Sequence, residues 1–271
     1  KGVHGGTVRL RIAGSGHLRG LVLIEENAAL TLVETHADDA GPMRNVGLEV
    51  MLCPGATLDH LRIAPRAEGA VAVESIEGLI RGDGRYRAHF ANFGAKLART
   101  DVHLVLEDAG GRAALSGVTV LGAHDHADVT THIEHAGLNS ESTQMFKYAL
   151  GGRSRGVYQG RITVKPGADG TDSRQTAKAI LIDKRAEADL KPELLIFADD
   201  VKCAHGAAVG DLDADSLFYL KSRGLSETEA RDLLIRAFLG EAVDEIAAED
   251  LRAEIWRDVE TALAHAMETV P

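Results

Sequence analysis

Turn-like segments recur along the first part of this chain at a spacing of about 28 residues. Between them lie short runs in which apolar and polar residues alternate, a period of two that is typical of β-strands. Signals for helices are sparse over the same stretch. A strand–turn unit that recurs at a fixed spacing predicts a solenoid. The recurring segments are residues 26–30, 54–58, 82–86 and 110–114, with half-way signals at 94–97 and 126–129.

Parallel strands need long crossovers, and a β-helix supplies them by making each crossover a strand of a second sheet. Roughly 200 residues at about 28 per coil give about seven coils, or a rod of about 35 Å. A two-sheet sandwich is the alternative, but the Asn-Gly and Asp-Gly signals of its hairpins are sparse. We therefore expect a mainly β chain: a right-handed parallel β-helix over residues 1–210, followed by a small helical domain over 211–271.

The C-terminal part carries start and stop signals for helices. Asp213 can cap a short helix that runs to about residue 222 and ends at Gly224. Ser226 and Glu229 have the spacing of a capping box, which opens a second helix that Gly240 is expected to end. A third helix is expected over residues 249–265, where apolar residues recur at helical spacing.

Composition limits the classes of partner. The formal net charge of −11 argues against nucleic acid and against an anionic membrane surface. No window approaches the roughly 18 consecutive apolar residues of a membrane span. Two cysteines, Cys53 and Cys203, do not make a disulfide framework, so a reducing cytoplasm is expected. The sequence starts without Met or a signal segment, so we expect an N-terminal part to be missing.

Cys203 and His205 are the closest pairing of these two residue types in the chain. They follow an apolar strand, and residues two apart in a strand point to the same side. A thiolate beside an imidazole suits iron, zinc or copper. A buried cysteine packed as a small apolar residue is the alternative.

The densest group of histidines lies between residues 124 and 135. If this stretch is one continuous strand, His132 and Glu134 share a side with the histidines at 124 and 126, and His135 opposes them. Surface histidines in contact with solvent are the favoured interpretation. Metal ligation by His132 and His135 stays open, because neutral imidazole suits iron and zinc.

Several longer motifs resemble the SufB/SufD family, whose members are scaffold subunits for iron–sulfur cluster assembly. The strings are Lys-Pro-Glu-Leu at 191–194, Ala-Asp-Asp-Val-Lys-Cys-Ala-His-Gly-Ala at 198–207 and Leu-Phe-Tyr-Leu-Lys-Ser-Arg-Gly at 217–224. The resemblance extends to residues 132–135 and 146–162. The Lys-Cys-x-His-Gly form at residues 202–206 is closer to the SufD branch, since SufB members carry further cysteines and a Glu where His205 stands.

The resemblance implies a β-helix and a non-enzymatic subunit that pairs with a SufB-like homologue through the coils near residues 195–210. His205 would then face a cysteine of the partner. No cofactor is expected to be held tightly; iron or an iron–sulfur cluster would form transiently between the subunits, with His205 and Cys203 at the interface. In isolation the chain could instead pair with itself.

The resemblance also implies that the C-terminal helices dock an ABC-type ATPase, SufC. The sequence has no phosphate-binding loop of the G-x-x-x-x-G-K-[ST] form, so ATP hydrolysis would belong to that partner. The expected contact residues are Leu217, Phe218, Tyr219, Leu220, Arg223, Leu234 and Phe238. A function from another class stays open: a metal-dependent or polysaccharide-acting β-helix enzyme that uses the histidines at 124–135.

Overall fold

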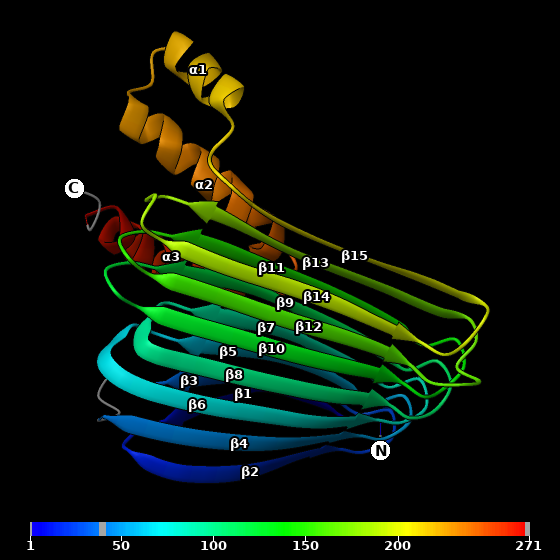
Figure 1. Cartoon of the computed structure of the whole chain (residues 1–271). Helices are drawn as coiled ribbons and strands as arrows, with labels where there is room; N and C mark the ends of the chain where they lie inside the picture. The colour runs from blue at the N-terminus through cyan, green and yellow to red at the C-terminus, as the bar shows by residue number, and fades with distance from the viewer. Residues whose placement is uncertain (1, 38–41, 269–271) are drawn as a thin grey trace.

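The computed structural model describes residues 2–37 and 42–268, so the outermost residues of the two expected regions, Lys1 and Pro271, lie outside the described residues. The described strands form two sheets that face each other (Figure 1). We call them the odd sheet and the even sheet after their strand numbers. The odd sheet contains β1 (His4–Ile12), β3 (Ala29–His36), β5 (Thr57–Ala64), β7 (Arg85–Asn92), β9 (Arg112–Leu121), β11 (Glu141–Leu150), β13 (Thr171–Leu181) and β15 (Val201–Gly210). The even sheet contains β2 (Gly16–Ile24), β4 (Met43–Leu52), β6 (Ala67–Ile80), β8 (Ala95–Leu106), β10 (His126–His135), β12 (Arg155–Val164) and β14 (Glu187–Ile196).

Successive strands alternate between the sheets, and each strand pairs in parallel with the strand two positions later. Leu58 on β5, for example, pairs with Tyr86 on β7, 28 residues further along. Hairpins would give antiparallel pairs, and every strand pair in the described part of the chain is parallel. The chain is therefore a parallel β-solenoid of about seven turns, as the periodicity predicted, and not a sandwich.

The recurring turns lie one above another at one corner of the solenoid. Each contains a residue with positive φ: Asn27 at 57°, Gly55 at 70° and Gly82 at 55°. The stack is close-packed, because a Cβ on Gly55 would lie 2.3 Å from Oδ1 of Asn27. Asn and Gly tolerate this left-handed backbone better than other residues. The same conformation continues up the stack at Gly110, Asn139 and Gly170.

Side chains on the inner surfaces of both sheets form the main core. Leu58, Tyr86 and Leu104 are fully buried there, and the Phe146 ring stacks on that of Phe90 and is tilted against that of Tyr158. Burial of aromatic and branched side chains is the dominant favourable term in folding a solenoid of this kind. The alternation of inward and outward residues fixes the register of each strand.

Three helices follow the solenoid: α1 (Ala214–Ser222), α2 (Glu227–Val243) and α3 (Glu249–Glu268). The expected caps are present, since Asp213 accepts a hydrogen bond from Ser216 N and Ser226 forms a capping box with Glu229. The expectation that Gly240 ends the second helix is wrong. Gly240 has no positive φ and lies inside α2, which continues to Val243, with the ring of Trp256 on α3 beside it.

Helices α2 and α3 pack against the solenoid. They cover the outer surface of the odd sheet, where Leu239, Ile255 and Val259 share one buried cluster with Val33 and Val118. Helix α1 has no buried residue and projects away from the sheets (Figure 1). Within the described ranges, none of the three helices is both long and apolar enough to cross a membrane.

Candidate functional site

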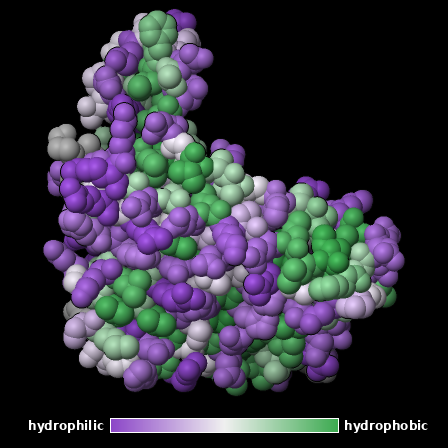
Figure 2. All heavy atoms as spheres, in the orientation of Figure 1, coloured by the Kyte–Doolittle hydropathy of each residue, from purple (hydrophilic) through white to green (hydrophobic). Residues whose placement is uncertain are grey.

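The last coil of the solenoid ends in an unpaired strand edge. Strand β15 pairs with β13, and no described strand pairs with its other side. The adjoining end of β14 is also uncovered, with Phe197 60% and Ile196 40% exposed. Figure 2 shows this apolar surface where β14 ends. An exposed edge with apolar neighbours is a template for pairing with another chain.

Cys203 and His205 lie on this last strand and point toward the inner side of the solenoid. In the register of β13 and β15, Cys203 is opposite Ser173 and His205 is opposite Gln175. Both partners are buried in the interior. The Cys203 side chain packs against a small apolar cluster that contains Ile162, whereas His205 is exposed. The predicted pair therefore shares one surface at the open end, where no further described coil covers it.

The environment of Cys203 favours the thiol over the thiolate. Burial raises the pKa of Cys203, and the nearby carboxylate of Asp172 raises it further. A hydrogen bond from the backbone of Ser173 acts in the opposite direction and is outweighed. Because the thiolate is the form that binds metal, this chain by itself does not present a strong ligand at Cys203.

Two buried hydrogen-bond networks lie in the interior directly beneath Cys203 and His205, and the sequence did not indicate either network. Beneath His205, Gln175 donates from Nε2 to the Tyr158 hydroxyl over 2.9 Å, and Tyr158 donates to Oε1 of Gln144 over 3.1 Å. Beneath Cys203, the Ser173 and Ser142 hydroxyls are 2.6 Å apart. Polar residues at inward-facing strand positions indicate such networks, but these positions can be recognised only when the strand register is known.

His135 belongs to the hydrogen-bond network beneath Cys203 and does not share a metal site with His132. Strand β10 is continuous, so the two histidines point to opposite sides, and one ion cannot be ligated by both. His135 is fully buried, with Nε2 2.8 Å from the Ser142 hydroxyl and Nδ1 2.7 Å from that of Ser140. Burial lowers the pKa of His135 to about 4, so the ring is neutral near pH 7.

His132 points outward and is stacked against a histidine that the sequence did not indicate. Its partner is His103 on β8, and the ring centroids are 4.8 Å apart. The two positions are 29 residues apart, which is close to the length of the repeat, so this spacing could have predicted that the two histidines are neighbours. Of the other histidines in this group, His126 also points outward and His124 precedes the strand.

A buried ionic network occupies the interior of the early coils. Glu34 lies between His36 and His60, with His60 Nε2 3.0 Å from Oε2 of Glu34. Burial by itself raises the pKa of Glu34, but hydrogen bonds from both histidines outweigh it and hold the pKa well below its usual range. Arg62 pairs with Glu74, and burial lowers the pKa of Arg62 to about 10. Each carboxylate has a partner, so this network fits a structural role.

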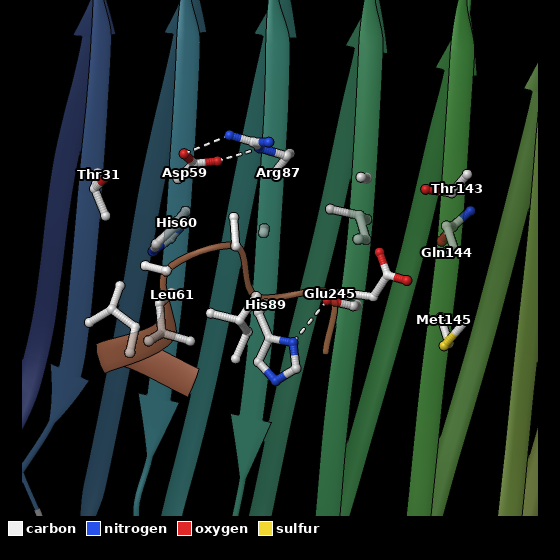
Figure 3. A pocket seen from close by; sticks show the side chains of 18 of the residues that line it. Thr31, Asp59, His60, Leu61, Arg87, His89, Thr143, Gln144, Met145 and Glu245 are labelled. Carbon is white, nitrogen blue, oxygen red and sulfur yellow. Dashed lines mark hydrogen bonds and ion pairs between the residues drawn. The ribbon is translucent and has the colours of Figure 1, made fainter. Parts of the chain in front are cut away.

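A cavity of about 590 Å³ lies between the outer surface of the odd sheet and the loop that joins α2 and α3 (Figure 3). Three charged strand residues line it: Arg87 and Asp59 pair with each other over 2.8 Å, and Arg174 pairs with Asp172 over 3.5 Å. His89 Nδ1 is 2.8 Å from the Ser116 hydroxyl, and burial lowers the pKa of His89 to about 3. The walls therefore combine apolar side chains with polar ones, and the charged strand residues among them already have partners.

The helix residues expected to contact an ATPase differ in their exposure and in what they pack against. Phe218 and Tyr219 on α1 are 74% and 55% exposed. Phe238 is half-buried beside the solenoid, with Nζ of Lys147 4.3 Å from its ring centroid. The others are partly covered or exposed: Leu217, Leu220 and Leu234 are half-buried, and Arg223 is exposed with its guanidinium 5.2 Å from the Tyr219 ring. Leu220 and Leu234 line a shallow groove between α1 and α2.

These features define a β-solenoid protein with an open terminal coil that presents a thiol and an imidazole. Residues 11–238 match the family described as "SUF system FeS cluster assembly, SufBD core domain". The chain belongs to this SufBD family.

Curated relatives agree with the family. The chain is 31% identical over 248 residues to an iron–sulfur cluster assembly SufBD family protein of Synechocystis sp., covering 88% of this chain and 54% of the relative. It is 28% identical over 243 residues to the iron–sulfur cluster assembly protein SufD of Escherichia coli, covering 89% of this chain and 57% of the relative. For SufD of Bacillus subtilis the values are 25% over 242 residues, 87% and 55%. The chain thus spans about half the length of these relatives.

Proposed function

We propose that this chain acts as a non-enzymatic, SufD-like scaffold subunit in iron–sulfur cluster assembly. The family membership and the names of its relatives support the process. The observation that carries the proposal is the position of Cys203 and His205 on the inward side of an unpaired terminal strand. A metal or sulfide held there would be accessible from outside the chain and close to the buried polar interior.

The proposal includes a SufB-like partner that pairs with the edge of β15. A cluster typically needs four ligands, and the terminal coil offers one thiol and one imidazole. A partner that approaches this edge would supply the remaining thiolates. The small residues Gly206 and Ala207 beside His205 let another backbone approach closely. In isolation, a second copy of this chain could occupy the same edge.

Iron or a cluster would be held transiently and not as a resident cofactor. The raised pKa of Cys203 supports this, because the protonated thiol is a weak ligand until a metal or a partner displaces its proton. Assembly on such a site followed by transfer is the behaviour of a scaffold. His205 would act as a ligand or take a proton from a partner thiol, since an imidazole nitrogen can do either.

An ABC-type ATPase is proposed to dock on α1 and the adjoining part of α2. The exposure of Phe218 and Tyr219 supports this contact, because large apolar side chains on a projecting helix commonly mark an interaction surface. Phe238 is better explained as a contact that holds α2 against β11. A cytoplasmic location stays a prediction; one relative, from Arabidopsis thaliana, is described as chloroplastic.

The test is co-expression of this chain with a SufB-like subunit and an ATPase, followed by measurement of subunit stoichiometry, iron and acid-labile sulfide. A complex that contains all three proteins and assembles a cluster supports the proposal. Cluster formation at the same yield without this chain would contradict it. Hydrolysis of a polysaccharide by the purified chain would favour the enzyme class instead.

A further inference from the structure

Two imidazole rings and a carboxylate meet on the outer surface of the even sheet. His103 on β8 and His132 on β10 are register partners, and their rings stack with an interplanar angle of 18°. Glu134 follows two residues after His132, so its side chain points to the same side of β10. This surface is separate from the terminal coil, where Cys203 and His205 point toward the solenoid interior.

The three side chains form a compact set of donors. One ligating atom of each lies within 4.8 Å of those of the other two, and all three residues are half-buried. Two imidazole nitrogens and one carboxylate oxygen suit borderline divalent ions such as Zn²⁺ and Fe²⁺. Such an ion lies about 2.0–2.2 Å from each donor, so small side-chain rotations would close the set around it.

The second nitrogen of His103 supports a metal in particular. His103 Nδ1 lies 2.9 Å from Oε2 of Glu77, so the carboxylate favours the proton on Nδ1. His103 Nε2 is buried and has no hydrogen-bond partner among the described residues. A carboxylate on one ring nitrogen and an unused lone pair on the other is the usual arrangement of a metal-ligating histidine.

The two neighbouring cations both have carboxylate partners. Arg161, the register partner of His132, is paired with Glu193 over 3.0 Å, and Lys165 is paired with Glu134 over 3.1 Å. The Thr163 hydroxyl lies 2.9 Å from His132 Nε2 and holds the ring in place.

We propose that His103, His132 and Glu134 bind a divalent transition-metal ion on the outer surface of the even sheet, with Glu77 as the residue that positions His103. The ion would replace Lys165 as the partner of Glu134, and it would separate the stacked rings enough for both nitrogens to reach it. The site is independent of the scaffold function proposed above, because none of its residues lies on the terminal coil.

The experiment uses the whole chain, freed of metal with a chelator, in a Cys203→Ser, His205→Ala background that removes the terminal coil as a competing site. Zn²⁺ is titrated by calorimetry and Co²⁺ by its visible absorption. We expect one ion per chain at micromolar affinity or better. His132→Ala and Glu134→Gln should each weaken binding by about 100-fold, and Glu77→Gln by about 10-fold. Melting temperatures of the metal-free variants check that the fold is intact.

His126→Ala is the matched control, because His126 lies on the same strand and the same side but outside the cluster. It should bind Zn²⁺ like the background protein. The proposal is overturned if the three cluster variants bind as tightly as His126→Ala, or if His126→Ala loses the ion equally. It is also overturned if the background protein binds Zn²⁺ more weakly than about 1 mM, in which case the stacked histidines serve the fold.

Discussion

His205 lies directly opposite Gln175 in the register of β15 and β13, yet Gln175 is buried and His205 is exposed. The two side chains occupy equivalent positions in consecutive coils. Their difference in exposure arises because another coil covers Gln175 and no described coil covers His205. His205 thus occupies a position that is buried in the preceding coil, but it is exposed at the end of the solenoid, where a partner would contact it.

We therefore predict that His205→Ala leaves the stability and the subunit stoichiometry unchanged but lowers the cluster content of the complex. An exposed side chain without packing contributes at most about 0.5 kcal/mol to the free energy of unfolding. Iron and acid-labile sulfide per complex are the measurement. Lys202→Ala is the control, since Lys202 lies on the same strand and points to the other side. A loss of stability that matches the loss of cluster would assign His205 to the fold.

The buried ionic network should be sensitive to the loss of one partner. Arg62→Met would leave Glu74 charged and without its closest cation, which typically costs about 3–5 kcal/mol of unfolding free energy. Denaturant unfolding measures this cost. Arg87→Ala is the control, because its pair with Asp59 is largely exposed and should cost no more than about 1 kcal/mol. Equal effects of the two variants would show that the interior is hydrated.

Stability should fall as the pH is lowered from about 6.5 to 4. The folded pKa values of His89 and His135, about 3 and about 4, lie below the ordinary value. The unfolded chain therefore binds protons first, and each histidine contributes a slope of up to about 1.4 kcal/mol per pH unit in this window. Glu34 adds to the loss at lower pH, because its pKa is also below its usual range.

Melting temperatures between pH 4 and 8 test this pH dependence. His89→Gln should flatten the curve, because it removes the group whose pKa burial lowers. A curve of identical shape in His89→Gln and the parent chain would contradict this prediction, because it would show that the pKa of His89 is the same in the folded and the unfolded chain.

Helix α1 offers a cleaner test of ATPase docking than truncation. Deleting everything after Gly210 would uncover the odd sheet, since α2 and α3 share a core with it. The double variant Phe218→Ala, Tyr219→Ala removes two exposed rings and should keep the melting temperature while abolishing co-purification of the ATPase. Leu233→Ala, which truncates an exposed apolar side chain on α2, tests whether the contact extends beyond α1. Full recovery of the ATPase with the double variant would contradict docking on α1.

The repeat was predictable because its cause is local. Asn27, Gly55 and Gly82 occupy a left-handed backbone position that few residues tolerate, so the requirement is visible in the sequence. The Ser226 capping box was predictable for the same reason. Gly240 misled the prediction, because α2 continues through it to Val243, where Leu239, Ala242 and Val243 are buried by tertiary contacts that no local pattern shows.

The partners of the candidate sites depend on register, and register depends on the exact length of every coil. His103 and His132 meet because their coil has 29 residues, whereas neighbouring coils differ in length by a few residues. An error of one residue would place His103 on the other side of the sheet. The buried position of Glu34 was equally hidden, since an acidic residue in a strand is usually exposed.

The cluster beneath α2 and α3 joins some of the earliest and latest parts of the described chain. Val33 on β3 shares it with Val259 and Leu263 on α3, and Arg9 forms an ion pair with Glu254, 245 residues away. During synthesis, the outer surface of the odd sheet would therefore stay uncovered until α3 leaves the ribosome. Such long-range closure slows folding and exposes apolar strands in the meantime. A cell that makes this protein would need chaperones most in the interval before the last helix docks.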